Sequence, residues 1–340
     1  MGSVRVTLKD VAEACGYTAN TVSRALRGDP RLPEATCEKI RRTAVELGYI
    51  RNSSASGLRS GRSGNIAVII NDLHNLHFCD MLSKMDAELR RAGYNMMVLC
   101  MQLNEELGRQ MIDTAISQSA DGILFFPYHN NPGHVEYMKK NGMPFVLLDR
   151  WIQDTVADSV RCDDERGGYL AGSHLASLGH RRYLFLSGVN RSSSQLDRLA
   201  GFLRAMREYG IPEQSVRIVP GETVEDALAK DCVEELLFPL DYTAIVSFRD
   251  EISYPVMLAL AREGLDVPRD VSIVSFDHLC GEIPYLPKLT SIYSEGENVA
   301  VHGVRLLLRR IENRNLPPQV MILPVRLFDE GTTAPLKKAE

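Results

Sequence analysis

The stretch TLKDVAEACGYTANTVSRALRG, residues 7–28, has the pattern of two short helices joined by a tight turn. Thr7 can cap the first helix, and Asp10 three residues later completes a weak variant of a capping box. A glycine permits the turn, and a second helix is predicted from about residue 19 to residue 27, with Thr18 as its cap. Two short helices joined by a few residues that include glycine are typical of a helix-turn-helix.

A third short helix completes this N-terminal segment. Pro33 suits its first turn, Ile40, Ala44 and Leu47 form its apolar side, and Gly48 ends it. Residues 1–65 hold 11 basic and 6 acidic side chains, whereas the remaining 275 residues hold 28 basic and 38 acidic ones. A basic head on an acidic body is expected if only the head meets a polyanion such as DNA.

Composition argues against several other classes of protein. No run approaches the roughly 18 consecutive apolar residues that a membrane span needs. The first residues are amphipathic rather than a continuous apolar signal segment. Seven scattered cysteines without a CxxC pair favour reduced thiols in a cytoplasm over a zinc site or a disulfide scaffold. We therefore expect a cytoplasmic protein with no membrane association and no metal or other cofactor.

From Ile66 onward, short apolar runs alternate with amphipathic segments: IAVII, NMMVLC, GILFF, PFVLLD, RYLFLSG, TAIVSF and VSIVSF. Such alternation predicts parallel sheets covered by helices on both faces. Some eleven strands are too many for one sheet, so two α/β subdomains are expected. Ligands of such sheets bind beyond the carboxyl ends of the strands, where polar or aromatic side chains stand here, namely Asp72, Tyr128, Asp149, Arg249 and Asp277.

Between the two parts lies RNSSASGLRSGRSGN, residues 51–65, which is rich in Ser, Gly and Arg. Its composition is typical of a flexible linker. Leu58 is the one large apolar side chain in this stretch, and a linker alone does not explain it.

Several blocks in order resemble the LacI/GalR family of bacterial repressors. Besides residues 7–28, they are ELGYIRNSSASGL, VLLDRW, DDERGGYLAGSHLASLGHRRYLFLSG, DRLAGFLRAM, EGLDVPRDVSIVSFDH and LPKLTSIY, and they span essentially the whole chain. The resemblance implies a small all-α helix-turn-helix DNA-binding domain followed by an α/β two-subdomain periplasmic-binding-protein-like domain with parallel sheets.

The implied boundaries place the DNA-binding domain at residues 1–50 and a hinge, whose helix forms on DNA, at 51–64. The effector-binding and dimerisation domain covers 65–340. Its N-subdomain is expected at about 65–162 plus 292–323, and its C-subdomain at about 163–291 plus 324–340.

The second helix resembles a recognition helix that enters the major groove of operator DNA. Ala19, Asn20 and Arg24 occupy base-reading positions: the alanine methyl can meet thymine, asparagine can bond adenine, and arginine can bond guanine. Hydroxyl and ammonium groups nearby can contact phosphates, although Thr21 and Ser23 could instead cap the helix internally. The other residues of the head expected to bind DNA are Thr7, Lys9, Thr18, Thr21 and Ser23.

Leu58 corresponds to the hinge leucine that family members insert into the minor groove, and Asn52 and Ala55 belong to the same hinge. The sequence departs from the family here, because Arg51 stands where proline is usual and Ser56-Gly57 where Arg-Ser is usual. Glycine weakens a helix by roughly 1 kcal/mol relative to alanine, so a hinge helix would form only on DNA.

In the body, Arg198 and Asp277 match the arginine and aspartate that clamp the family's effector. Asp149 and Trp151 follow the strand PFVLL at the same cleft, and a sugar requires this mixture of planar polar groups and an aromatic face. Asp149 could instead be a structural cap, and Phe78 could pack in the core. The full expected set is Asp72, His77, Phe78, Tyr128, Asp149, Trp151, Arg198, Arg249 and Asp277.

The leading hypothesis is a homodimeric repressor that a carbohydrate-like effector releases from a pseudo-palindromic operator. Arg249 replaces a common asparagine, and with Arg150 and Arg198 it could favour an anionic sugar, unless Arg150 points away. A corepressor-dependent regulator with a purine-like ligand is one alternative, and a solute-binding protein is another from a different class. An enzyme is not expected, because no nucleophile, base and orienting group are patterned together.

Overall fold

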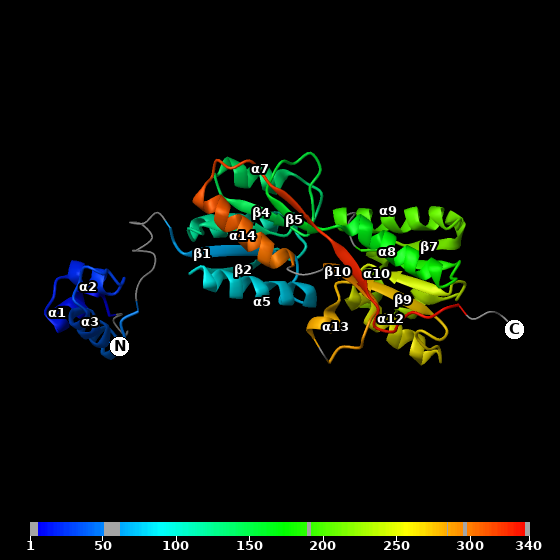
Figure 1. The fold of residues 1–340 in the computed structure, drawn as a ribbon, viewed down its shortest axis with the longest axis horizontal. Helices are drawn as coiled ribbons and strands as arrows, with labels where there is room; N and C mark the ends of the chain where they lie inside the picture. Colours follow the sequence, from blue (N-terminus) through cyan, green and yellow to red (C-terminus); the bar gives the residue numbers. More distant parts are fainter. Residues whose placement is uncertain (1–5, 51–61, 189–191, 284, 295–297, 337–340) are drawn as a thin grey trace. The chain divides into compact units, whose positions relative to one another are not determined.

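The computed structural model describes residues 6–50, 62–188, 192–283, 285–294 and 298–336. It divides into two units: the head, Met1–Ser63, and the body, Gly64–Glu340 (Figure 1). No described helix is long and apolar enough to cross a membrane.

The head contains three helices: α1 (Leu8–Cys15), α2 (Ala19–Ala25) and α3 (Glu34–Glu46). The predicted capping box of Thr7 and Asp10 is confirmed, and so is the cap by Thr18. The second helix ends two residues earlier than expected. Buried apolar side chains from all three helices form one small core: Val11, Ala12, Cys15, Val22, Ala25, Cys37, Ile40 and Ala44. Leu47, expected on the inner side, is instead the exposed C-cap residue of α3.

The body consists of two lobes, each built on a six-stranded sheet. Lobe one has the strand order β11-β5-β4-β3-β1-β2 and lobe two the order β12-β10-β9-β8-β6-β7. Every pairing is parallel except that of β10 with β12, so the expected parallel sheets carry one antiparallel edge strand. The strands are β1 (Asn65–Ile70), β2 (Asn95–Cys100), β3 (Gly122–Phe125), β4 (Phe145–Leu148), β5 (Ser159–Cys162), β6 (Tyr183–Leu186), β7 (Val216–Val219), β8 (Ala244–Ser247), β9 (Ser272–Phe276), β10 (Ser291–Ser294), β11 (Val320–Leu323) and β12 (Val325–Phe328).

Helices cover both faces of each sheet because alternate strand residues point to opposite sides. In lobe one, Ile66, Val68 and Ile70 pack with α5 (Leu76–Arg91) and α14 (Val299–Glu312). Ala67 and Ile69 pack on the other face with α6 (Glu105–Ser117) and α7 (Gly133–Lys140).

Lobe two repeats this layering. One face packs against α8 (Asp164–Ser177) and α9 (Ser193–Glu208). The other packs against α10 (Gly221–Ala229), α11 (Glu234–Leu237) and α12 (Asp250–Arg262). Two short helices, η1 (Glu213–Ser215) and α13 (Leu279–Glu282), complete the lobe.

The chain passes between the lobes three times: after β5, after β10, and between β11 and β12 (Figure 1). The second passage corrects one expected boundary. The family resemblance placed residues from about 292 onward in the N-subdomain, but β10 pairs with β9 in the sheet of lobe two. The return to lobe one therefore follows Ser294, because the strand completes the second sheet first.

Candidate functional site

The exposed start of α2 forms a polar surface on the head. Val22 and Ala25 face the core, whereas Thr18, Ala19 and Asn20 are exposed. This surface has the short polar side chains that a helix needs to approach base edges.

Arg24 is held from within the head. Its Nε donates to Asp29 Oδ2 at 2.9 Å, and the side chain keeps about a third of its surface exposed. Asp29 also accepts from Arg31, and hydrogen bonds from Arg31 and Arg24 hold the pKa of this carboxyl well below its usual value. Asp29 thus aligns the candidate base reader, a role that the sequence analysis missed although the acid stands only five residues away.

The other head residues have local partners. Thr18 Oγ1 accepts from the backbone N–H of Thr21 at 3.2 Å, and the two hydroxyls lie 2.9 Å apart. These contacts agree with the alternative that Thr21 takes part in capping the helix. Ser23 is partly buried, and its carbonyl accepts from Arg27 Nε. Lys9 is largely exposed, with Nζ 3.9 Å from Glu13. Their DNA contacts stay predictions, and Asn52, Ala55 and Leu58 lie outside the described residues.

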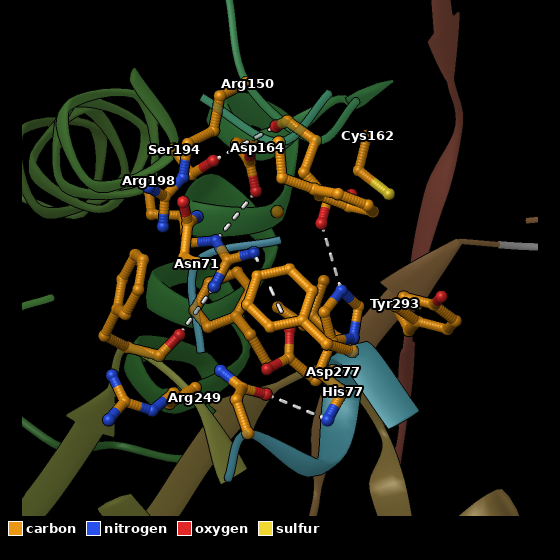
Figure 2. A pocket seen from close by; sticks show the side chains of 18 of the residues that line it. Asn71, His77, Arg150, Cys162, Asp164, Ser194, Arg198, Arg249, Asp277 and Tyr293 are labelled. Atoms are coloured by element: carbon orange, nitrogen blue, oxygen red, sulfur yellow. Dashed lines mark hydrogen bonds and ion pairs between the residues drawn. The ribbon is translucent and has the colours of Figure 1, made fainter. Parts of the chain in front are cut away.

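The body holds a pocket to which both lobes contribute (Figure 2). Eight of the nine expected effector residues line it, all except Trp151. Further lining residues are Asn71, Asn75, Leu103, Phe126, Arg150, Cys162, Asp163, Asp164, Gly167, Ser194, Glu225, Phe248, Phe276, Ile292, Tyr293 and Val325.

Arg198 on α9 is the most heavily bonded cation of this pocket. Its Nε donates to Asp164 Oδ1 at 2.7 Å, Nη1 donates to the carbonyl of Phe248 at 2.5 Å, and Nη2 lies 3.9 Å from Asp277 Oδ1. The guanidinium carbon stands 4.2 Å from the ring centre of Phe276 and 4.7 Å from that of Phe248. Burial opposes its charge, but the neighbouring carboxylates outweigh this and raise the pKa of Arg198.

Close contact between α8 and α9 positions this arginine. A Cβ at Gly168 would lie 1.9 Å from the carbonyl oxygen of Arg198, and one at Gly201 would lie 1.9 Å from that of Glu165. Only glycine permits this backbone approach. The two glycines therefore bring Asp164 at the start of α8 within reach of Arg198 on α9.

His77 forms the matching charged pair in lobe one. Its Nε2 lies 3.1 Å from Asp149 Oδ2, and Tyr293 meets the imidazole edge to face. Burial lowers the pKa of His77, but Asp277 and the hydrogen-bonded Asp149 raise it to about 9. The imidazole is therefore protonated at neutral pH.

Two of the carboxylates stand on unusual backbone. Asp149 has φ of 65° and Asp277 φ of 97°, where side chains other than glycine are uncommon. Strained positions of this kind cluster at ligand sites, where the surrounding structure holds them. This favours a site role for Asp149 over the alternative of a plain structural cap.

The remaining expected residues differ in their environment. Arg249 pairs with Glu225 at 2.7 Å and Glu251 at 3.3 Å, and Glu251 also accepts from the backbone N–H of Leu76 in lobe one. Phe78 is buried against Phe126 and also lines the pocket, so it is both a core residue and a candidate effector contact.

Trp151, expected at the same cleft, is not among the residues that line the pocket, and its contact with an effector stays a prediction. Its indole Nε1 donates to Asp197 Oδ2 at 2.8 Å, and its backbone N–H donates to Ser193 Oγ. The Trp151 side chain, which follows β4 of lobe one, thus forms a hydrogen bond to α9 of lobe two. Arg150, which could have pointed away, lines the pocket.

Several lining residues were not predicted from the sequence, and their position at strand ends is the signal for them. Asn71 directly follows β1, Asp164 follows β5, Phe248 follows β8, and Phe276 ends β9. Asn71 is 3 % exposed, and its Oδ1 has no hydrogen-bond partner among the described residues. An unsatisfied buried acceptor at a pocket wall is suited to a ligand donor.

A helix-turn-helix head on a two-lobed ligand-binding body defines a DNA-binding regulator that carries its own effector domain, and comparisons with known proteins agree. Residues 7–52 match the family model "Bacterial regulatory proteins, lacI family", and residues 173–333 match "Periplasmic binding protein-like domain". The chain belongs to the lacI family of bacterial transcriptional regulators.

Among similar proteins is catabolite control protein A of Priestia megaterium, which is 28 % identical over 97 % of this chain and 100 % of its own length. The lac repressor dimer bound to operator and an anti-inducer is 24 % identical, covers 97 % of this chain and 100 % of its own, and has a TM-score of 0.80. A LacI-family regulator of Enterococcus faecium with bound ribose is 27 % identical, covers 80 % of this chain and 100 % of its own, and has a TM-score of 0.67.

Proposed function

We propose that this regulator is a repressor that binds a pseudo-palindromic operator as a homodimer and releases it when a carbohydrate-like effector enters the body. We place it in the cytoplasm with the DNA it binds, and we assign it no catalytic activity. The two-lobed origin of the pocket carries the proposal. A ligand that touches Asn71, His77 and Asp149 of lobe one and Arg198 and Asp277 of lobe two would favour one angle between the lobes.

The chemistry of the pocket suits a polyhydroxylated ligand. Carboxylates, a guanidinium and the open Asn71 acceptor offer paired hydrogen bonds to neighbouring hydroxyls, while Phe248 and Phe276 offer apolar faces to C–H groups. The similar regulator of Enterococcus faecium holds ribose, which supports this class of ligand.

The head supports the DNA-binding half of the proposal. The exposed α2 surface around Ala19 and Asn20 can read only a few base pairs. One copy would discriminate poorly among the many competing sites of a genome, so a twofold dimer on two half-sites is expected.

The test begins with selection of binding sites from a random DNA library, which should return sequences with two inverted half-sites. Operator affinity is then measured in the presence of sugars, sugar acids and nucleobases, and light scattering gives the mass, expected at twice 37.9 kDa. Selection of no DNA sequence, or a stable monomer on the operator, would contradict the proposal. Tighter operator binding with a nucleobase would favour the corepressor alternative instead.

A further inference from the structure

Arg150 differs from the other cations of the pocket in its partners. Arg198 has Asp164 and Asp277, Arg249 has Glu225 and Glu251, and His77 has Asp149. Among the described residues, no carboxylate lies within ion-pair distance of Arg150. The pocket thus contains one cation without a direct ion pair among the described residues, although Asp149 and Asp164 act on its charge from a greater distance.

Backbone carbonyls alone hold the Arg150 side chain. Its Nη1 donates to the carbonyl oxygens of Pro127 at 3.0 Å and Tyr128 at 3.2 Å, which leaves Nε and Nη2 without a partner among the described residues. Burial lowers the pKa of Arg150, opposite in direction to the shift at Arg198. A cation in this position is stabilised by an anion that the protein does not supply.

The carboxylates of the pocket wall are already engaged. Six of them line the pocket against three arginines and His77, so its overall charge alone would disfavour an anion. Four pair with the three other cations, as described above. The other two are bound locally: Asp163 caps α8, and Asp72 accepts from the backbone N–H of His74. Figure 2 shows Arg150 near the top of the view and Arg249 near the bottom, so the two arginines enter the pocket from different sides.

We propose that Arg150 anchors a single carboxylate on the effector, which makes the ligand class a sugar acid rather than a neutral sugar. The inference rests on the proposed function, because it assumes that this pocket receives the effector. The fork of Nε and Nη2 matches the two oxygens of a carboxylate. A phosphate monoester carries close to two negative charges at neutral pH, and no second open cation lines the pocket in the described residues to meet the other charge.

The experiment compares matched ligand pairs by calorimetry on the full chain: D-glucuronate with D-glucose, D-galacturonate with D-galactose, and D-gluconate with D-sorbitol. The proteins are wild type, Arg150→Met, Arg150→Lys and the control Arg204→Met, whose arginine lies on α9 outside the pocket lining. At least one acid should bind wild type and the control at least ~10-fold more tightly than its neutral partner. Arg150→Met should weaken that acid by about 10- to 100-fold and leave the neutral partner within ~3-fold, while Arg150→Lys keeps part of the preference.

Three results would overturn the assignment: a neutral sugar as the tightest ligand, no binding of any acid, or an equal loss of both members of a pair in Arg150→Met. The last would mean that Arg150 only positions the Tyr128 loop. Melting curves establish that each variant is folded. If Arg150→Met does not fold, the ratio of acid to neutral affinity in Arg150→Lys tests the assignment instead. A neutral sugar that releases the operator would remove this inference and leave the proposed function standing, whereas failure to select any operator would remove the proposed function itself.

Discussion

The polar groups of the head find partners nearby in the sequence, whereas those of the pocket find them far away. Thr7 pairs with Asp10 and Arg24 with Asp29, at separations of three and five residues. In the pocket, Arg198 and Asp164 are 34 residues apart and His77 and Asp149 are 72. The head surface is therefore fixed by local chain geometry, while the pocket exists only when both lobes have folded and met.

Burial follows the same division. The Lys9 side chain is 82 % exposed, whereas those of Arg198 and Asp164 are 13 % and 5 % exposed. Exposed charges contribute little to folding because water and salt screen them, but a buried charge that loses its partner is strongly destabilising. Substitutions in the pocket should therefore affect the stability of the body, whereas substitutions in the head should affect only DNA binding.

Arg198→Met should give the largest effect. It leaves Asp164 buried without its cation, so the free energy of unfolding should fall by about 3–5 kcal/mol, and the change in operator affinity on adding effector should vanish. Urea unfolding measures the first effect, and fluorescence anisotropy with labelled operator, with and without effector, measures the second.

Arg204→Met is the matched control, because Arg204 lies on the same helix as Arg198 but pairs with Glu165 of α8 in a half-exposed position. It should change stability by no more than about 1 kcal/mol and keep the effector response. An Arg198→Met protein that still responds fully to effector would remove the assignment of the pocket.

The pH dependence of stability should reveal His77. Its pKa is about 9 in the folded protein against 6.5 for the free side chain, so its stabilising contribution is complete below about pH 6.5 and disappears as the pH rises through 9. Over that range the free energy of unfolding should fall by up to about 3 kcal/mol.

His77→Gln should remove this part of the pH dependence in urea unfolding series from pH 6 to pH 10. His74→Gln is the control, because His74 is 96 % exposed and should leave the curve of the wild type unchanged. Equal slopes for wild type and His77→Gln would show that the imidazole is not held as a cation by Asp149 and Asp277.

The sequence predicted most of the fold because the signals for it are local. Caps, glycine turns and the alternation of strands with helices placed the head helices and the two lobes. It missed Asp164, Phe248 and Phe276 as site residues, since their roles depend on which strand ends meet at the pocket. Trp151 shows the limit most clearly, because it stands two residues after a lining aspartate and yet bonds Asp197 instead.

The β10 boundary was misplaced for a related physical reason. Ser291 and Ile292 pair with β9 through backbone hydrogen bonds, and side-chain patterns do not record pairing between distant strands. The unusual backbone of Asp149 and Asp277 was likewise invisible, since φ above zero at a residue other than glycine leaves no mark in composition.

Arg24→Ala tests whether the locally built head surface reads bases. Loss of a guanidinium on guanine should cost about 1–3 kcal/mol and relax the preference at one operator position. Asp29→Asn should have a smaller effect at the same position, because it only weakens the 2.9 Å contact that holds the Arg24 side chain in place. Affinities on a set of single-base operator variants measure both, and a uniform loss across the set in Arg24→Ala would mean that Arg24 contacts no base.

Lys9→Ala should give the smallest effect on affinity and the clearest dependence on salt. Its ammonium group is exposed at the start of α1. The pair with Glu13 is long, at 3.9 Å, and exposed to solvent, so it holds Lys9 weakly and a phosphate can replace it. Removing one phosphate contact from each head should weaken every operator variant alike. It should also reduce the slope of log affinity against log salt concentration by about 0.9 for each head. Lys140→Ala, at the end of α7 in the body, should leave that slope unchanged. A Lys9→Ala protein that discriminates differently among operator variants would place Lys9 at a base edge and show that the head reads sequence from two helices.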